Sequence, residues 1–143
     1  MSAGAGVVHS ERNASALNPV HFLQIWIQPS ARGIQPGYEQ RAFPEAERRG
    51  RLRLVASPDG RDGSVTIQQD ASVFAGILGP GESARHEIAS GRSAWVQVAR
   101  GEVTVNGERL FAGDGLAATG EAALDLAGAG GADAEVLVFD LPA

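Results

Sequence analysis

The chain has 143 residues, a formal net charge of −5 and no cysteine. This length suits one compact domain with a modest core, and a chain without cysteine forms no disulfide and has no thiolate chemistry. The acidic balance disfavours nonspecific binding to nucleic acid, and no apolar stretch approaches the roughly 20 residues of a membrane-spanning helix. Because residues 1–6 also lack the basic start and apolar centre of a signal peptide, we expect a cytoplasmic protein without membrane or direct nucleic-acid partners.

The N-terminal stretch contains a pair of candidate metal ligands. Its Gly4, Gly6, His9 and Asn13 have the spacing with which the second sequence motif of cupin proteins ends, so the stretch resembles that motif. Glu11 follows His9 by two positions, and in a strand such residues face the same side and reach one point. An imidazole nitrogen and a carboxylate oxygen suit iron, zinc or manganese. The alternative is that both are ordinary surface residues near a flexible terminus.

The following segments predict one strand, a linker and a short helix or loop. His21–Ile27 is rich in β-branched and aromatic side chains and lies between Pro19 and Pro29, which is typical of a strand. Residues 29–40 contain two prolines and two glycines and indicate an extended linker. The charged residues 43–50 are expected to form one helical turn or a loop.

From residue 52 onward, short apolar runs alternate with turn signals. The expected strands cover residues 52–55, 65–69, 73–78, 85–88, a run around Leu124 and Leu126, and Glu135–Leu141. Clusters of glycine, proline and aspartate at 57–63, 79–81 and 128–133 separate them, as is typical of turns.

The stretch Trp95–Ala118 has the clearest strand pattern. Four valines alternate with polar neighbours, as in half-buried strands: Val96, Val98, Val103 and Val105. Three turn signals divide the run into short strands: Arg100-Gly101, Asn106-Gly107 and Gly113-Asp114-Gly115. The spacing resembles the second half of a cupin, and we therefore predict an all-β cupin fold, an antiparallel barrel or jelly roll.

Two glycine-framed motifs locate the metal-ligand positions that a cupin barrel would have. Counted from Gly81 and Gly107, these positions fall on Glu87, Ala89, Ala94 and Ala118. Alanine cannot coordinate a metal, so the resemblance implies a barrel that has lost its metal. His86 precedes a ligand position by one residue, and in an extended strand it should point the other way, as a surface or hydrogen-bonded histidine.

The chain also contains the motifs SAG-x-GV-x-HSE, LQIWI-x-P and GI-x-PGYEQ. With these motifs it resembles the pirin family, two-barrel cupins that include quercetinase-like proteins. The resemblance implies that residues 1–28 are remnant strands of a truncated N-terminal cupin, residues 29–50 a linker, and residues 51–143 the C-terminal cupin barrel.

The resemblance also implies a metal site and an activity. Pirin-like proteins bind one metal, usually iron, through three histidines and a glutamate. His9 and Glu11 match one ligand pair, the His-x-His segment of the other pair is absent, and His21 matches no ligand motif. Some family members cleave flavonols such as quercetin with dioxygen, and others are transcription cofactors. The chain thus resembles a truncated quercetin 2,3-dioxygenase with an incomplete metal site; the alternative is a non-catalytic binding or regulatory module.

Apolar residues in the N-terminal strands predict self-association. Leaving Phe22, Ile25 and Trp26 in water costs about 1.5–3 kcal/mol for each side chain, and an unpaired strand edge invites pairing with another chain. We therefore expect a homodimer through the N-terminal strands, in which two His9–Glu11 pairs can complete one site. A flavonoid-like small molecule is the expected ligand.

Overall fold

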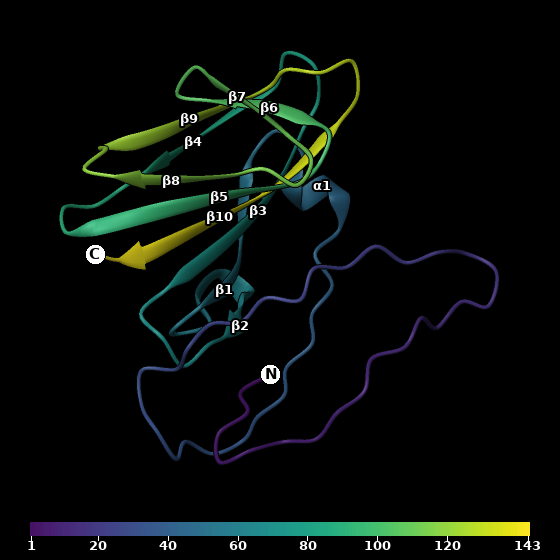
Figure 1. Ribbon diagram of the computed structural model, residues 1–143, viewed down its shortest axis with the longest axis vertical. Helices are drawn as coiled ribbons and strands as arrows, with labels where there is room; N and C mark the ends of the chain where they lie inside the picture. Colours follow the sequence, from purple (N-terminus) through teal and green to yellow (C-terminus); the bar gives the residue numbers. More distant parts are fainter.

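A computed structural model describes all 143 residues (Figure 1). Its regular elements are ten strands and one helical turn, and they begin only after residue 44. In chain order they are α1 (Glu45–Arg48), β1 (Leu52–Ser57), β2 (Val65–Thr66), β3 (Ser72–Leu78), β4 (Ser83–Glu87), β5 (Arg92–Arg100), β6 (Glu102–Val105), β7 (Glu108–Phe111), β8 (Gly115–Thr119), β9 (Ala123–Gly128) and β10 (Ala134–Pro142). A short 3₁₀ turn, Arg61–Gly63, lies between β1 and β2. The helical turn α1 is far too short to cross a membrane, and no other helix is a candidate span.

The strands form two sheets that face each other. One sheet has six strands in the order β2-β1-β3-β10-β5-β8, and the other has four in the order β4-β9-β6-β7. Every pairing is antiparallel except the two-residue contact of β1 with β2. The sheets remain two layers of a jelly roll rather than a closed barrel (Figure 1). The predicted all-β cupin architecture is confirmed. Of the two expected forms, an antiparallel barrel or a jelly roll, the structure has the jelly roll.

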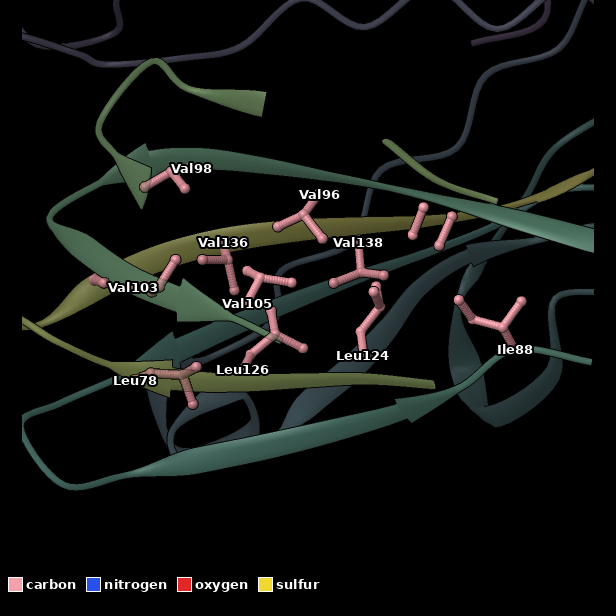
Figure 2. Close-up of a cluster of buried hydrophobic side chains, with 13 residues drawn as sticks. Leu78, Ile88, Val96, Val98, Val103, Val105, Leu124, Leu126, Val136 and Val138 are labelled. Carbon is pink, nitrogen blue, oxygen red and sulfur yellow. The ribbon is translucent and has the colours of Figure 1, made fainter. Parts of the chain in front are cut away.

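The core lies between the two sheets and follows the alternation of the strands. Val136 and Val138 on β10 point inward beside Val96 and Val98 on β5, and Leu124 on β9 faces them from the other sheet (Figure 2). All five side chains are buried. A strand sends every second side chain to the same face, so the period-two pattern of the sequence is sufficient to assign this core.

The hairpin between β6 and β7 illustrates how local chemistry sets the register. Asn106 and Gly107 have φ of 49° and 88°, the left-handed conformations that a two-residue hairpin turn requires. Val105 consequently pairs with Glu108. The turn predicted from Asn106-Gly107 is confirmed.

The N-terminal segment differs from its prediction. Residues 1–44 contain no strand, only an isolated bridge between Ser2 and Gly37, so the strand predicted over His21–Ile27 is wrong. In Figure 1 this segment is a long coil without arrows. A strand needs a neighbour that satisfies its backbone hydrogen bonds, and no backbone lies in register beside these residues. The second half of the strand predicted over residues 65–69 is also irregular, because β2 ends at Thr66.

Candidate metal centre

His9 and Glu11 lie together, as the sequence predicted. The His9 Nε2 and Glu11 Oε1 atoms are 3.7 Å apart, and the two side chains are 40% and 57% exposed. They lie in coil rather than in a strand, so their proximity comes from the short spacing and not from strand alternation. Their exposure leaves both donors accessible to an ion from solvent.

The pair has the chemistry and nearly the spacing of two ligands to one metal. Metal–nitrogen and metal–oxygen bonds of about 2.1 Å at a tetrahedral angle place the two donor atoms about 3.4 Å apart, close to the observed separation. A protein-held site needs three or four donors. No group of three or more histidine, cysteine, aspartate or glutamate residues in the chain is arranged to hold a metal. His9 and Glu11 therefore fit as half of a ligand set.

The remaining histidine of the N-terminal segment lies elsewhere. His21 Nδ1 accepts a hydrogen bond from Arg100 Nε at 3.0 Å, which ties the segment to the end of β5. This contact gives His21, which matches no ligand motif, a role in anchoring the coil.

Two of the cupin ligand positions in the jelly roll are sealed in the core. Ala94 on β5 and Ala118 on β8 are direct cross-strand partners, 2% and 5% exposed, and both belong to the buried apolar cluster. Ala89 is exposed in the loop before β5. Ala94 and Ala118 thus occupy the inner face without offering a donor atom or an accessible space.

The assignment of Glu87 to an inward ligand position is wrong. Glu87 is exposed and accepts a hydrogen bond from Arg85 Nε at 2.6 Å. His86, expected to point the other way, is instead the inward residue of β4, 9% exposed. The cause is the alternation of side chains along β4. Ala84 and His86 share its inner face, and Ile88, the residue directly after β4, continues the same side. The apolar residues two positions before and after His86 were the sequence signal for its orientation.

A hydrogen-bonded charge network surrounds His86. Its Nε2 atom lies 2.9 Å from Asp140 Oδ2, and its ring packs 4.8 Å from the ring of Phe74. Asp140 is the inward residue of β10 and pairs directly with Ala94. Arg92 Nε also donates to the Asp140 carboxylate. The polar network therefore lies beside the alanine ligand positions, and sequence patterning missed both Asp140 and Arg92.

The network joins the two sheets and satisfies its own polar groups. Arg92 Nη1 donates to Asp70 Oδ2 at 3.0 Å, so one guanidinium bridges two carboxylates. Its hydrogen bond to Asp140 is the main cause that raises the pKa of Arg92 above the ordinary value. No buried side-chain nitrogen or oxygen of the chain lacks a hydrogen-bond partner. A fully satisfied network of this kind is suited to stabilising the fold, not to binding a metal.

Comparison with known proteins relates the chain to one group. The family model described as the quercetinase C-terminal cupin domain matches residues 54–141. The quercetin 2,3-dioxygenase of Escherichia coli K12 is 44% identical over 142 residues, which are 99% of this chain and 59% of that protein. A pirin-like protein of Caulobacter vibrioides is 34% identical over 141 residues, or 98% of this chain and 60% of that protein. The chain therefore spans about three fifths of the length of these relatives.

Solved structures give the same relationship. The crystal structure of YhhW from Escherichia coli superposes with a TM-score of 0.74 at 43% identity, covering 82% of this chain and 48% of that chain. A structure of the bacterial pirin YhhW in complex with nickel(II) superposes with a TM-score of 0.73 at 44% identity and the same coverage.

Proposed function

Because this chain belongs to the pirin family of cupin proteins, we propose that it carries half of the ligand set of a metal-dependent dioxygenase related to quercetin 2,3-dioxygenases. The observation that supports this proposal is the exposed His9–Glu11 pair, with donor atoms 3.7 Å apart. A metal bound there would supply Lewis-acid and redox chemistry. His9 and Glu11 would hold it through the imidazole Nε2 and a carboxylate oxygen.

Iron is the metal that the family resemblance implies, and nickel(II) is the ion named for the related YhhW structure. Imidazole and carboxylate donors accept either ion, with nickel binding more tightly than iron(II) at a given site. This donor set therefore accepts both iron and nickel(II). Titration with each ion separately should show which of the two binds more tightly.

The remaining donors come, in this proposal, from outside the single chain of 143 residues. One source is a further segment, in line with a two-barrel layout in which residues 1–28 belong to the first cupin, residues 29–50 form a linker and residues 51–143 form the C-terminal cupin. The other source is a second copy, whose own His9 and Glu11 would complete a four-donor site in the homodimer. Exposed Val7 and Val8 beside His9 support such an association. We also propose the cytoplasmic location expected from the sequence.

The second candidate function is a non-catalytic binding or regulatory module. It is favoured by the jelly roll itself, where buried Ala94 and Ala118 fill the ligand positions. Under this proposal the C-terminal cupin, residues 51–143, provides a surface that binds another molecule. Any chemistry would be carried out by the N-terminal cupin.

Metal titration of the purified full chain tests the main proposal. We expect weak binding of nickel(II) or iron(II), measured by calorimetry and by metal analysis after gel filtration, that is lost in His9→Ala and in Glu11→Ala. His21→Ala is the matched control, because that histidine is also in the N-terminal segment but is bound to Arg100. Metal that persists in both ligand variants, or that is lost in the His21 control alone, would refute the assignment.

A further inference from the structure

A pocket of about 370 Å³ lies at the outer edge of β1, in the six-stranded sheet (Figure 1). Its lining includes the four consecutive residues 51–54. Because successive side chains of a strand point to opposite faces, a pocket that contacts all four lies along the edge of the strand. Its volume is within the range of small-molecule sites in proteins, roughly 300–1,000 Å³.

The edge of β1 is open along this pocket. Residues 52–54 pair only with β3, because β2 pairs only with Ala56 and Ser57. In an antiparallel pair, every second residue directs its N–H and C=O groups away from the neighbouring strand. Residues 52–54 make no other backbone hydrogen bond, so at least one backbone N–H on this edge is available to a bound molecule.

The pocket gathers positive charge in an acidic chain. Three arginines line it, Arg51, Arg53 and Arg61, together with the two acidic residues Glu47 and Asp62. Three guanidinium groups and two carboxylates leave an excess of one positive charge, whereas the whole chain has a net charge of −5. The planar guanidinium group matches carboxylate and phosphate oxygens with two parallel hydrogen bonds, so the lining favours an anion.

Two of the three arginines are held in place by the protein, and the third is available. Arg53 Nε donates to Glu47 Oε2 at 3.1 Å, and Arg61 Nη2 donates to Ser72 Oγ at 3.0 Å. Arg53 and Arg61 each have a carboxylate partner, but Arg51 has none. The one hydrogen bond of Arg51 is long, 3.4 Å from its Nε to the Arg49 carbonyl oxygen. Its remaining N–H donors are therefore free to bind an anion.

Apolar side chains form the rest of the lining. Leu54 on β1 and Phe74 on β3 are direct cross-strand partners, and Leu52 lies on the same face two residues before Leu54. An inorganic anion would use the arginines and leave this apolar surface in water. A neutral molecule would cover the arginines without pairing with them, at a cost in lost hydration. The lining as a whole matches a molecule that has both an anionic and an apolar part.

We infer that this pocket binds a small organic anion, in which a carboxylate or phosphate group is attached to an apolar body. The anionic group would lie at Arg51 and Arg53, and the apolar body would lie against Leu54 and Phe74. Neither His9 nor Glu11 lines the pocket, so this site is separate from the proposed metal centre. Arginines at a sheet edge can also serve only to prevent pairing with another chain, and in that case no anion would bind.

Nuclear magnetic resonance of the ¹⁵N-labelled full chain tests the inference, because it detects weak binding and locates it. The chain is titrated with phenyl phosphate and with benzoate in the presence of EDTA. We expect saturable shifts of the Nε–H signals of Arg51, Arg53 and Arg61, and of the backbone amides of residues 52–54. The tighter binder of the two shows whether phosphate or carboxylate is preferred. Inorganic phosphate lacks the apolar body and benzyl alcohol lacks the charge, so each should bind at least about 5-fold more weakly.

Charge variants change the affinity in opposite directions. Arg51→Gln should weaken binding about 5- to 30-fold, the size of one charge-assisted hydrogen bond. Asp62→Asn removes a negative charge from the lining and should strengthen binding about 2- to 5-fold. Asparagine tolerates the positive φ of 54° at this position, so the fold should be kept, which circular dichroism checks. Arg32→Gln is the matched control, because Arg32 is also exposed but lies outside the pocket, and its affinity should be unchanged.

Failure of this inference is distinguishable from failure of the metal proposal. His9→Ala should bind phenyl phosphate as the unmodified chain does in EDTA, since other residues line the pocket. Shifts that do not saturate, or that spread over arginines outside the pocket, would overturn the assignment. So would equal affinities of Arg51→Gln and Arg32→Gln, or equal binding of benzyl alcohol and phenyl phosphate, because the arginines would then only protect the sheet edge.

Discussion

Replacing Asp140 with alanine should destabilise the jelly roll more than any other single change to a charged residue. Asp140 is 9% exposed and accepts hydrogen bonds from both His86 and Arg92. His86 belongs to the four-stranded sheet and Asp140 to the six-stranded one. Asp140→Ala therefore removes the shared acceptor that joins the two layers and leaves two donors without their partner.

The expected loss is about 2–3 kcal/mol in the free energy of unfolding. Breaking a buried ion pair by removing one partner costs about 3–5 kcal/mol. The cost is smaller here, because the Arg92 side chain is 22% exposed and retains its ion pair with Asp70. For a domain of this size, each kcal/mol lowers the melting temperature by roughly 3–5 °C, so the variant should melt about 6–15 °C lower.

Urea denaturation followed by circular dichroism measures this loss, and a double-mutant cycle with His86→Ala separates the pair from its surroundings. We expect a coupling energy of about 1–2 kcal/mol between His86 and Asp140. Asp125→Ala is the matched control, since Asp125 forms an exposed ion pair with Arg85 that should contribute at most about 1 kcal/mol. A loss below about 0.5 kcal/mol for Asp140→Ala, or strict additivity with His86→Ala, would show that the network does not hold the sheets together.

Three further changes probe the core, the acid stability and the N-terminal segment. Leu124→Ala should cost about 2–5 kcal/mol by urea denaturation, because Leu124 is 0% exposed in the core (Figure 2), whereas Leu17→Ala at a 93% exposed position should cost almost nothing. The hydrogen bond from Arg49 holds the pKa of the Asp133 carboxyl below its ordinary 3.8, so its stabilising contribution is present above pH 3.8 and is lost as the pH falls through the lower folded-state value. Asp133→Asn should accordingly flatten the dependence of stability on pH below about 4, and an unchanged acid-unfolding profile would contradict this. Deleting Met1–Gln40 should convert the proposed dimer into a folded monomer by light scattering; a dimer that survives the deletion would place the interface on the jelly roll, and a monomeric full chain would rule the dimer out.

Local patterns predicted most of the jelly roll. The strand expected over Glu135–Leu141 is present as β10, and the structure places Val136 and Val138 inside, in alternation with Leu137 and Phe139. Asn106-Gly107 predicted its hairpin turn, because the required positive φ values are properties of those two residues. Such features depend only on neighbours along the chain, so the amino-acid order is enough to read them. The closeness of His9 and Glu11 is also of this kind.

Other features depended on which strands meet. His21–Ile27 has the composition of a strand, but composition does not provide a pairing partner, and the segment instead lies as coil beside the sheet. The inward position of His86 was readable from Ala84 and Ile88, yet counting from the cupin glycines placed Glu87 there instead. Motif spacing counts residues, whereas the two faces of a strand alternate, so an offset of one residue reverses the assignment.

The charge network and the arginine-lined pocket were decided by tertiary structure alone. Asp140 and His86 are 54 residues apart in sequence, and their hydrogen bond arises because β10 and β4 lie in opposite sheets of one layered fold. Glu47, Arg61 and Phe74 likewise come from separate elements that only the packing places around one pocket. The amino-acid sequence by itself determined most strands of the jelly roll, its turns and the proximity of His9 to Glu11, since these are set by short-range sterics and spacing. Contacts between distant residues depend on sheet order and layer packing, which no short stretch of sequence encodes.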